Sequence, residues 1–124
     1  MSKFFFLIIA GGIGALLRYS VSLFFLKYTN TNFPLGVLVV NILGSFIFGL
    51  IWALSEDKGI IGPEVRLVIL VGFLGSFTTF STFAFDNISL FSNGQIGYFI
   101  INILLNNLLG IFFVYLGFKV SKLV

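Results

Sequence analysis

The chain consists of long apolar runs separated by short polar segments. Four runs are long enough to cross a membrane as helices, because about 20 mostly apolar residues span ~30 Å of hydrocarbon. They cover residues 4–26, 35–54, 65–90 and 96–118. The segments between them carry Asn, Gly, Pro and charged residues, which is typical of turns at the headgroup level. The pattern predicts an all-α integral membrane protein, with four transmembrane helices per subunit in a single membrane domain over residues 1–124.

The first apolar run follows a cationic start, as the apolar region of a signal peptide does. It continues past Arg18, however, and no small-x-small cleavage site followed by a polar sequence interrupts it. We therefore expect this run to be a membrane span.

The composition agrees with a membrane protein and excludes most enzyme classes. The chain is 59% hydrophobic and 9% charged, with a mean hydropathy of +1.17, which is outside the range of soluble domains. It has no Cys and no His, so thiolate or imidazole metal sites, disulfides and catalytic pairs of these residues are excluded. The net charge is +3, but the cations are scattered, and we expect no binding to nucleic acid.

The cations are distributed unequally between the two sides of the membrane. Only Lys27 lies in a segment on one side, and Arg18 falls within a span. The other five share the side of both termini: Lys3, Lys58, Arg66, Lys119 and Lys122. Cytoplasmic segments are enriched in Lys and Arg, so both termini are predicted to be cytoplasmic. Polar residues within the spans need partners away from lipid, which favours an oligomer.

Two of these polar residues lie in the first and second spans. An arginine at the depth of Arg18 costs roughly 2.5 to 3.5 kcal/mol on insertion scales. Its guanidinium either reaches the interface on its long stem or forms a positive vestibule that attracts anions. The Asn41 amide has donors that lipid cannot satisfy, so it either bonds across helices or serves a polar path. The small residues nearby, "GGIG" at 11–14 and Gly44, Ser45 and Gly49, predict close helix packing.

The fourth span carries a line of polar and small positions. Asn102, Asn106 and Gly110 recur every four residues and therefore share one helical face. Such a line can be a polar track for an ion, or it can be a contact between helices.

The third span contains the string "GSFTTFSTF" at 75–83, with five hydroxyl side chains in nine positions. Glycine weakens a helix, and Ser and Thr side chains compete for backbone groups. We therefore expect a break at the centre of this helix, within 75–78, with a regular helix resuming at Phe80. Exposed carbonyl oxygens at membrane depth require a cation or donors from a partner.

This string, together with "NILGS" at 41–45 and "GGIGALLR" at 11–18, resembles the Fluc/CrcB family of fluoride channels. The resemblance extends over the whole chain in length, number of spans and order of motifs. It implies an antiparallel, dual-topology dimer with fluoride pores and a structural sodium ion, which is not transported. The implied sodium ligands are the backbone carbonyls of Gly75 and Thr78 in both subunits.

The same resemblance implies a fluoride pathway and a vestibule. The pathway residues would be Asn41, Phe80, Phe83, Ser81, Thr82, Asn102 and Asn106, and the vestibule residue would be Arg18. Phenylalanine edges carry positive charge and amides and hydroxyls donate hydrogen bonds, so such residues can replace the water around a small anion. Asp86 is either a counterpart of the family's acidic residue or a carboxylate at a helix end.

The sequence therefore predicts a passive channel that exports cytoplasmic fluoride and lowers its toxicity, and no enzyme. We expect it as a multi-pass protein of the cell membrane, or of the inner membrane in a Gram-negative cell. Its partners would be fluoride, the lipid bilayer and a second subunit, with a homodimer favoured and a heterodimer with a homologue as the alternative. The competing functions are a small proton-coupled multidrug exporter and a non-transporting membrane scaffold.

Overall fold

The computed structural model describes residues 2–124, and this part of the chain is helical with no strands. Four helical segments are long and apolar enough to span a membrane, which confirms the all-α prediction. They are α1 (Ser2–Tyr28), α2 (Leu35–Glu56), a composite third segment (Pro63–Ser92) and α6 (Ile96–Ser121). They extend up to three residues beyond the predicted ends.

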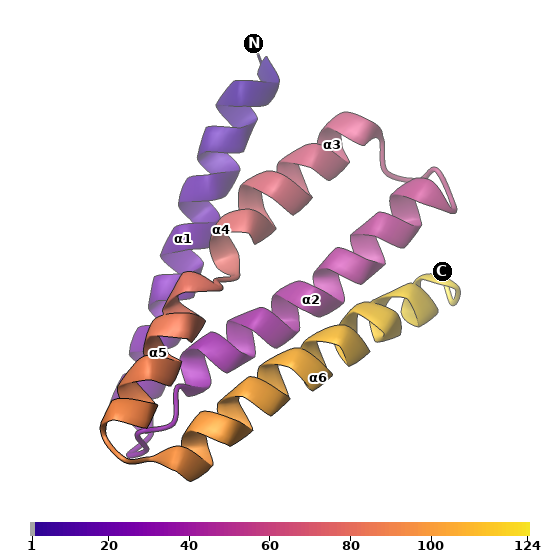
Figure 1. Ribbon diagram of the computed structural model, residues 1–124. Coiled ribbons are helices and arrows are strands. Elements are labelled where there is room, and N and C mark those ends of the chain that lie inside the picture. Colours follow the sequence, from indigo (N-terminus) through magenta and orange to yellow (C-terminus); the bar gives the residue numbers. More distant parts are fainter. Residues whose placement is uncertain (1) are drawn as a thin grey trace.

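The third segment is not a single regular helix. It consists of α3 (Pro63–Leu67), the π-helical turns of η1 (Val68–Leu74), the short α4 (Gly75–Phe77) and, after an interruption, α5 (Ser81–Ser92). Wide turns of the π type inside a helix are rare and often lie at functional sites. In Figure 1 the interruption separates α4 from α5 near the middle of the span.

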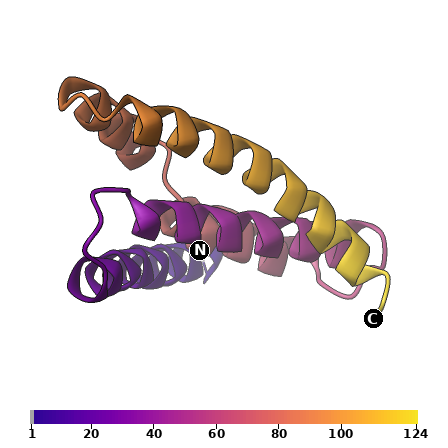
Figure 2. The same ribbon diagram turned by 90° about the horizontal axis from the view of Figure 1, so that it is seen from below.

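The helices fan out from one end of the molecule (Figure 1). The α1–α2 and α5–α6 connections lie at the narrow end, whereas both termini and the connection from α2 to α3 lie at the wide end. Helix α2 packs mainly on α6, and α1 packs mainly on η1 and α4. The view from below shows α2 with α6 along one side and α1 beneath them (Figure 2).

Small residues let these helices approach closely, as predicted. A Cβ atom on Gly14 of α1 would overlap the Phe73 carbonyl oxygen and the Ser76 side chain. A Cβ atom on Gly49 of α2 would overlap the Val114 carbonyl of α6. Gly12, by contrast, faces open space. The "GGIG" segment therefore contributes to packing chiefly through Gly14.

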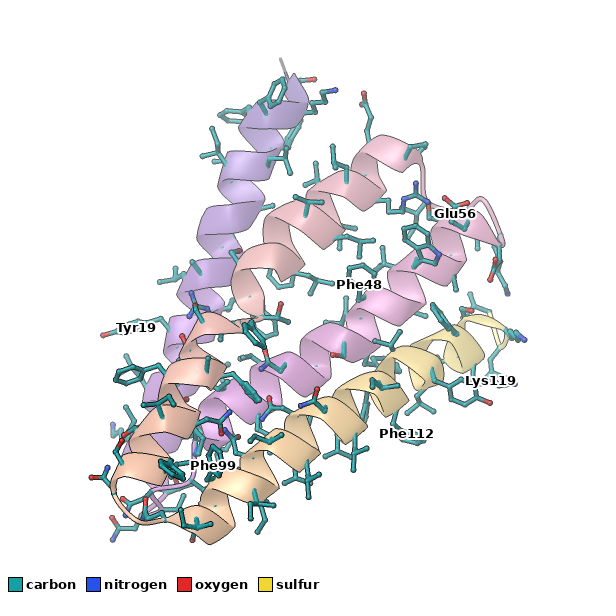
Figure 3. The ribbon with its side chains drawn as sticks, viewed as in Figure 1. Tyr19, Phe48, Glu56, Phe99, Phe112 and Lys119 are labelled. Atoms are coloured by element: carbon teal, nitrogen blue, oxygen red, sulfur yellow. The ribbon has the colours of Figure 1, made fainter. Side chains whose placement is uncertain are left out.

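The apolar core is small, and much apolar surface lies outside it. The core cluster contains Val40, Leu70, Leu74 and Phe77. Large apolar side chains point outward along α1 and α6, and Phe112 is one example in Figure 3. Such an outer surface is typical of a chain whose helices contact lipid or another subunit.

Candidate functional site

The interruption of the third span is the centre of the candidate site. Thr78 has an extended backbone (φ −85°, ψ 159°), and α5 begins at Ser81. Gly75 keeps helical angles (φ −61°, ψ −27°), so the break lies at residues 78–80 rather than across the predicted 75–78. The regular helix accordingly resumes at Ser81 and not at Phe80.

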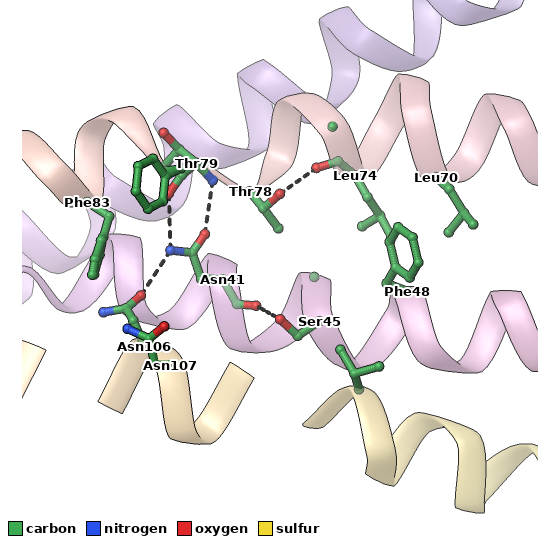
Figure 4. A pocket seen from close by; sticks show the side chains of 14 residues that line it. Asn41, Ser45, Phe48, Leu70, Leu74, Thr78, Thr79, Phe83, Asn106 and Asn107 are labelled. Carbon is green, nitrogen blue, oxygen red and sulfur yellow. Dashed lines mark hydrogen bonds between the residues drawn. The ribbon is translucent and has the colours of Figure 1, made fainter. Parts of the chain in front are cut away.

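A side chain of α2 explains the position of the break. The Thr79 N–H donates to the Asn41 Oδ1 (3.0 Å), and the Thr79 carbonyl accepts from the Asn41 Nδ2 (3.2 Å). In a regular helix the same N–H would donate to the carbonyl of residue 75. The Thr79 hydroxyl also accepts a bond from the Thr82 N–H (3.2 Å), a contact typical of a helix N-terminus. These bonds replace the helical ones and keep residues 78–80 out of a regular helix. Figure 4 shows the two bonds between Asn41 and Thr79.

Asn41 also begins a chain of carboxamides that connects three helices. Its Nδ2 donates to the Asn106 Oδ1 at 3.0 Å. The Asn106 Nδ2 donates to both the carbonyl and the Oδ1 of Asn102, each at 2.9 Å. The Asn102 Nδ2 donates in turn to the Asn87 Oδ1 at 2.9 Å. The predicted interhelical bonding of Asn41 is therefore confirmed, and the polar face of α6 points toward α2 and α5.

Two members of this network, Thr79 and Asn87, are not among the site residues predicted from the sequence. Thr79 had been counted only as one of five hydroxyls, whereas its backbone is the group that Asn41 binds. Asn87 is 7% exposed and contacts Asn102 across α5 and α6. The sequence does show Asn87 as an amide residue within the third apolar run. No periodic spacing, however, links it to Asn102 in the fourth.

Arg18 lies against the end of the first half of the third span. Its Nε donates to the Ser76 carbonyl at 3.0 Å, one of the carbonyls that lose their helical donors at the break. A cation at a helix C-terminus is stabilised by the helix dipole. This contact explains how an arginine is accommodated within a span, and it places positive charge beside the break.

A cavity of about 430 Å³ opens at the break. The predicted site residues that line it are Asn41, Gly75, Thr78, Phe80, Phe83 and Asn106. The lining contains no charged side chain. Figure 4 shows Asn41, Thr79 and Asn106 together on one side of this cavity. It is therefore a neutral cavity lined by amides, backbone groups and aromatic rings.

The two phenylalanines of the cavity differ in their exposure. Phe80 is 81% exposed, whereas Phe83 is 8% exposed. Their ring centroids are 5.8 Å apart, with the ring planes tilted by 34°. Phe83 is therefore held by the chain's own packing, and Phe80 presents its ring to the surroundings.

The remaining predicted residues lie outside this cavity. Thr82 lines a separate cavity together with Asp86, and Ser81 is exposed. Asn102 is fully buried, and Gly110 lies near Ser45 of α2. The structure therefore joins Asn41, Asn106 and both phenylalanines, but it does not bring Ser81 and Thr82 to the same cavity.

Gly75 and Thr78 are the predicted ligands for a cation. The N–H groups that would donate to these two carbonyls in a regular helix are bonded elsewhere: the Thr79 N–H to the Asn41 Oδ1 and the Thr82 N–H to the Thr79 hydroxyl. Gly75 is exposed and Thr78 is half-buried. Such carbonyls fit the oxygen ligands that hard cations prefer. No group of three or more carboxylates in this part of the chain offers an alternative metal site.

Known proteins resemble this chain over almost its full length. Residues 5–118 match the family described as CrcB-like protein, Camphor Resistance (CrcB). The "Fluoride-specific ion channel FluC" of Shewanella halifaxensis is 44% identical over 117 residues, 94% of each chain. The protein of the same name from Desulforapulum autotrophicum is 41% identical over 122 residues, 98% of each chain. The "Fluoride-specific ion channel FluC 1" of Methanosarcina acetivorans is 46% identical over 115 residues, 93% of this chain and 86% of the relative.

Proposed function

The chain belongs to the CrcB family, and we propose that it is a fluoride-selective channel through which cytoplasmic fluoride leaves the cell passively. Such export lowers the toxicity of fluoride and needs no catalytic residue. The names of the relatives support fluoride as the transported ion, and the four helices long enough to span a membrane support a channel. We assign the chain to a single membrane domain in the cell membrane, or in the inner membrane of a Gram-negative cell.

The observation that carries this proposal is the neutral, donor-lined cavity at the break. Fluoride holds its water tightly, so a narrow path must supply hydrogen-bond donors and positive ring edges in place of that water. Asn41, Asn106, Phe80 and Phe83 meet at this cavity, with no carboxylate in its lining to repel an anion. Thr82 and Ser81 would extend the path along α5, and Asn102 would extend it along α6.

The bonding of Asn41 indicates how an anion would bind there. A carboxamide nitrogen has two hydrogens, and both are bonded, one to the Thr79 carbonyl and one to the Asn106 Oδ1. A fluoride ion would replace the Asn106 oxygen as acceptor, while the Thr79 bonds keep Asn41 in place. Hydrogen bonds to an anion are roughly twice as strong as those between neutral groups, so this exchange is favourable once the ion has lost its water.

Arg18 would act from outside the cavity. Its guanidinium is held by the Ser76 carbonyl next to the break, so its charge raises the electrostatic potential of the region without occupying the path. This position suits a vestibule residue that draws anions toward the pore.

A structural sodium ion fits the free carbonyls of Gly75 and Thr78. With two ligands from each of two subunits, the ion would be enclosed at the subunit interface. When bound, it would supply a fixed positive charge near both pores and satisfy the carbonyls that the break exposes. Anomalous scattering from a substituted heavier cation would test this site, and a dimer whose centre holds no cation would contradict it.

We further propose an antiparallel dimer in which a second copy covers the exposed side of the break. The exposed ring of Phe80 and the exposed Gly75 favour a covering partner. A homodimer requires both orientations of a chain whose cations favour one, so a heterodimer with an oppositely oriented homologue is the alternative. Labelling of each terminus in intact cells distinguishes the two, because a homodimer predicts both orientations.

The deciding experiment is efflux of fluoride from liposomes that contain the purified protein. We expect rapid fluoride release when an ionophore carries the counter-charge, and far slower release of chloride. Equal chloride release would contradict a selective channel. Transport that requires a pH gradient would identify a proton-coupled exporter, and the absence of any flux would leave a membrane scaffold.

A further inference from the structure

The orientation of every carboxamide in the chain of asparagines follows from the backbone at the break. The Thr79 N–H can only donate and its carbonyl can only accept, so the Asn41 oxygen must face the N–H and its nitrogen must face the carbonyl. Amide oxygen and nitrogen are otherwise hard to distinguish, and they are assigned from such partners. The backbone therefore fixes Asn41 without reference to the other side chains.

This orientation is transmitted to the far end of the chain. The remaining Asn41 hydrogen requires an acceptor, so the Asn106 oxygen faces Asn41 and its nitrogen faces Asn102. The bond from the Asn106 nitrogen to the Asn102 carbonyl independently requires the same orientation. The Asn102 oxygen is then used as an acceptor, and its nitrogen donates to the Asn87 oxygen. Asn87 is consequently left with its NH₂ group at the end of the chain.

The Asn87 NH₂ group is a donor without an acceptor. Within the described residues 2–124, the only hydrogen bond of the Asn87 side chain is the one that its oxygen accepts from Asn102. Asn87 as a residue is only 7% exposed. No fully enclosed side-chain nitrogen or oxygen in this part of the chain lacks a partner, so the Asn87 nitrogen must reach the surface. Asn87 is therefore a mostly buried residue whose NH₂ group opens to the surface with both hydrogens free of a protein acceptor, whereas polar groups at such depth are nearly always paired.

We propose that the NH₂ group of Asn87 is a further anion-binding group for fluoride, at the end of the polar path between α5 and α6. The inference rests on the proposed channel function. It adds a residue that is not among the pathway residues implied by the family resemblance. The aligned carboxamides strengthen the site, because each donating amide polarises the next. The neighbouring Asp86 carboxylate lines two cavities, one with Thr82 and one with Asn93, and Asn87 lines neither of them.

The test compares two substitutions that separate donation by Asn87 from its support of Asn102. Asn87→Asp keeps an oxygen that accepts from Asn102 but removes both donors, whereas Asn87→Leu removes donors and acceptor together. We expect both variants to release fluoride from liposomes about tenfold or more slowly than wild type, since a hydrogen bond to an ion is lost. Ser92→Asp is the control for charge, because it adds the same carboxylate roughly 7 Å further along α5 at an exposed position.

Each outcome bears on the inference. Wild-type flux in Asn87→Asp with reduced flux in Asn87→Leu would overturn it, since Asn87 would then only position Asn102. Wild-type flux in both would overturn it as well, and so would an equal loss in Ser92→Asp, which would assign the effect to charge alone. If wild type itself carries no fluoride, the proposed channel function fails instead.

A third variant distinguishes loss of hydrogen-bond donation from loss of folding. Asn87→Ser is smaller, and its hydroxyl can accept from Asn102 while donating to an anion. We expect its flux to lie between those of wild type and Asn87→Leu, with the elution volume of the wild-type oligomer unchanged. A well-folded Asn87→Ser protein with flux as low as that of Asn87→Leu would contradict donation by this residue.

Discussion

The interface between α2 and α6 has two halves that are held together differently. Toward the wide end, Gly49 and Gly117 bring the two backbones into contact, with no space for even one further carbon atom on either glycine. Toward the narrow end, the Asn41 and Asn106 carboxamides bond across the interface instead. The glycine half fixes the distance between the helices, whereas the amide half also reaches the third span and holds its break open.

The difference shows how a chain with a small apolar core can maintain an interrupted helix. Apolar packing in lipid has no hydrophobic driving force between helices, so close contact and hydrogen bonds must supply the association. The glycine half provides the contact, and the amide half provides hydrogen bonds at the cavity where the proposed fluoride path lies. We expect changes in the two halves to separate stability from transport.

The largest effect on stability is expected at Asn41, because its side chain serves two regions. Asn41→Leu leaves the Thr79 N–H, the Thr79 carbonyl and the Asn106 oxygen without partners. We expect a loss of about 2 to 4 kcal/mol in the free energy of unfolding, since each unpaired group costs about 1 to 3 kcal/mol and part is recovered by relaxation. Thermal unfolding in detergent measures it.

Asn41→Asp tests transport at the same position. The carboxylate can still accept the Thr79 N–H but cannot donate to the Thr79 carbonyl or to Asn106. We expect the proposed dimer to persist while fluoride flux falls by at least about tenfold, because a negative charge at the cavity opposes an anion. Wild-type flux in Asn41→Asp would remove Asn41 from the pathway.

The second effect tests the glycine half with one substitution at two positions of α6. A Cβ atom on Gly117 would overlap the backbone of α2 at Phe46 and Leu50, whereas one on Gly97 would meet nothing. We expect Gly117→Ala to lower the free energy of unfolding by about 1 to 3 kcal/mol through overpacking. Gly97→Ala should be neutral or slightly stabilising, because alanine favours a helix. Equal melting temperatures for the two variants would contradict the close contact.

The sequence predicted the four spans more accurately than the position of the break. Runs of about 20 apolar residues are a direct consequence of bilayer thickness, so the four spans were found to within three residues. The break was placed too early, because its position depends on Asn41, a side chain 38 residues away. Gly75 weakens a helix in principle, yet here it remains helical. Local propensity therefore predicted that a break exists, and a tertiary contact determines where it lies.

The candidate site shows the same limit. Asn102 and Asn106 were found because a repeat of four residues aligns them on one helical face. Asn87 has no such relation to Asn102, since the two meet only where α5 packs against α6. Thr82 and Ser81 are adjacent to the phenylalanines in sequence, but the helical rotation of α5 directs Thr82 toward another cavity. Pairings between helices are not contained in the periodicity of either one.

The third effect compares neighbouring asparagines of α6. Asn106 bonds to Asn41 on another helix, whereas the exposed Asn107 donates only to the Ile103 carbonyl of its own helix, at 2.8 Å. Asn106→Leu should lower the free energy of unfolding by about 1 kcal/mol, the usual size of an interhelical hydrogen bond in a membrane. Asn107→Leu should change it by less than about 0.5 kcal/mol. Unfolding midpoints that fall equally would mean that Asn106 contributes no more than a surface residue.

The smallest effect on stability is expected at Phe80, and it separates folding from transport most clearly. Its ring is 81% exposed, so Phe80→Ile should change the free energy of unfolding of the subunit by less than about 0.5 kcal/mol. An aliphatic side chain offers no positive ring edge to an anion, and fluoride flux should therefore fall. The matched change at the buried ring, Phe83→Ile, should lower both flux and stability, because it also alters packing. Liposome efflux and unfolding in detergent, measured on both variants, test the distinction, and wild-type flux in Phe80→Ile would show that this ring does not contact the ion.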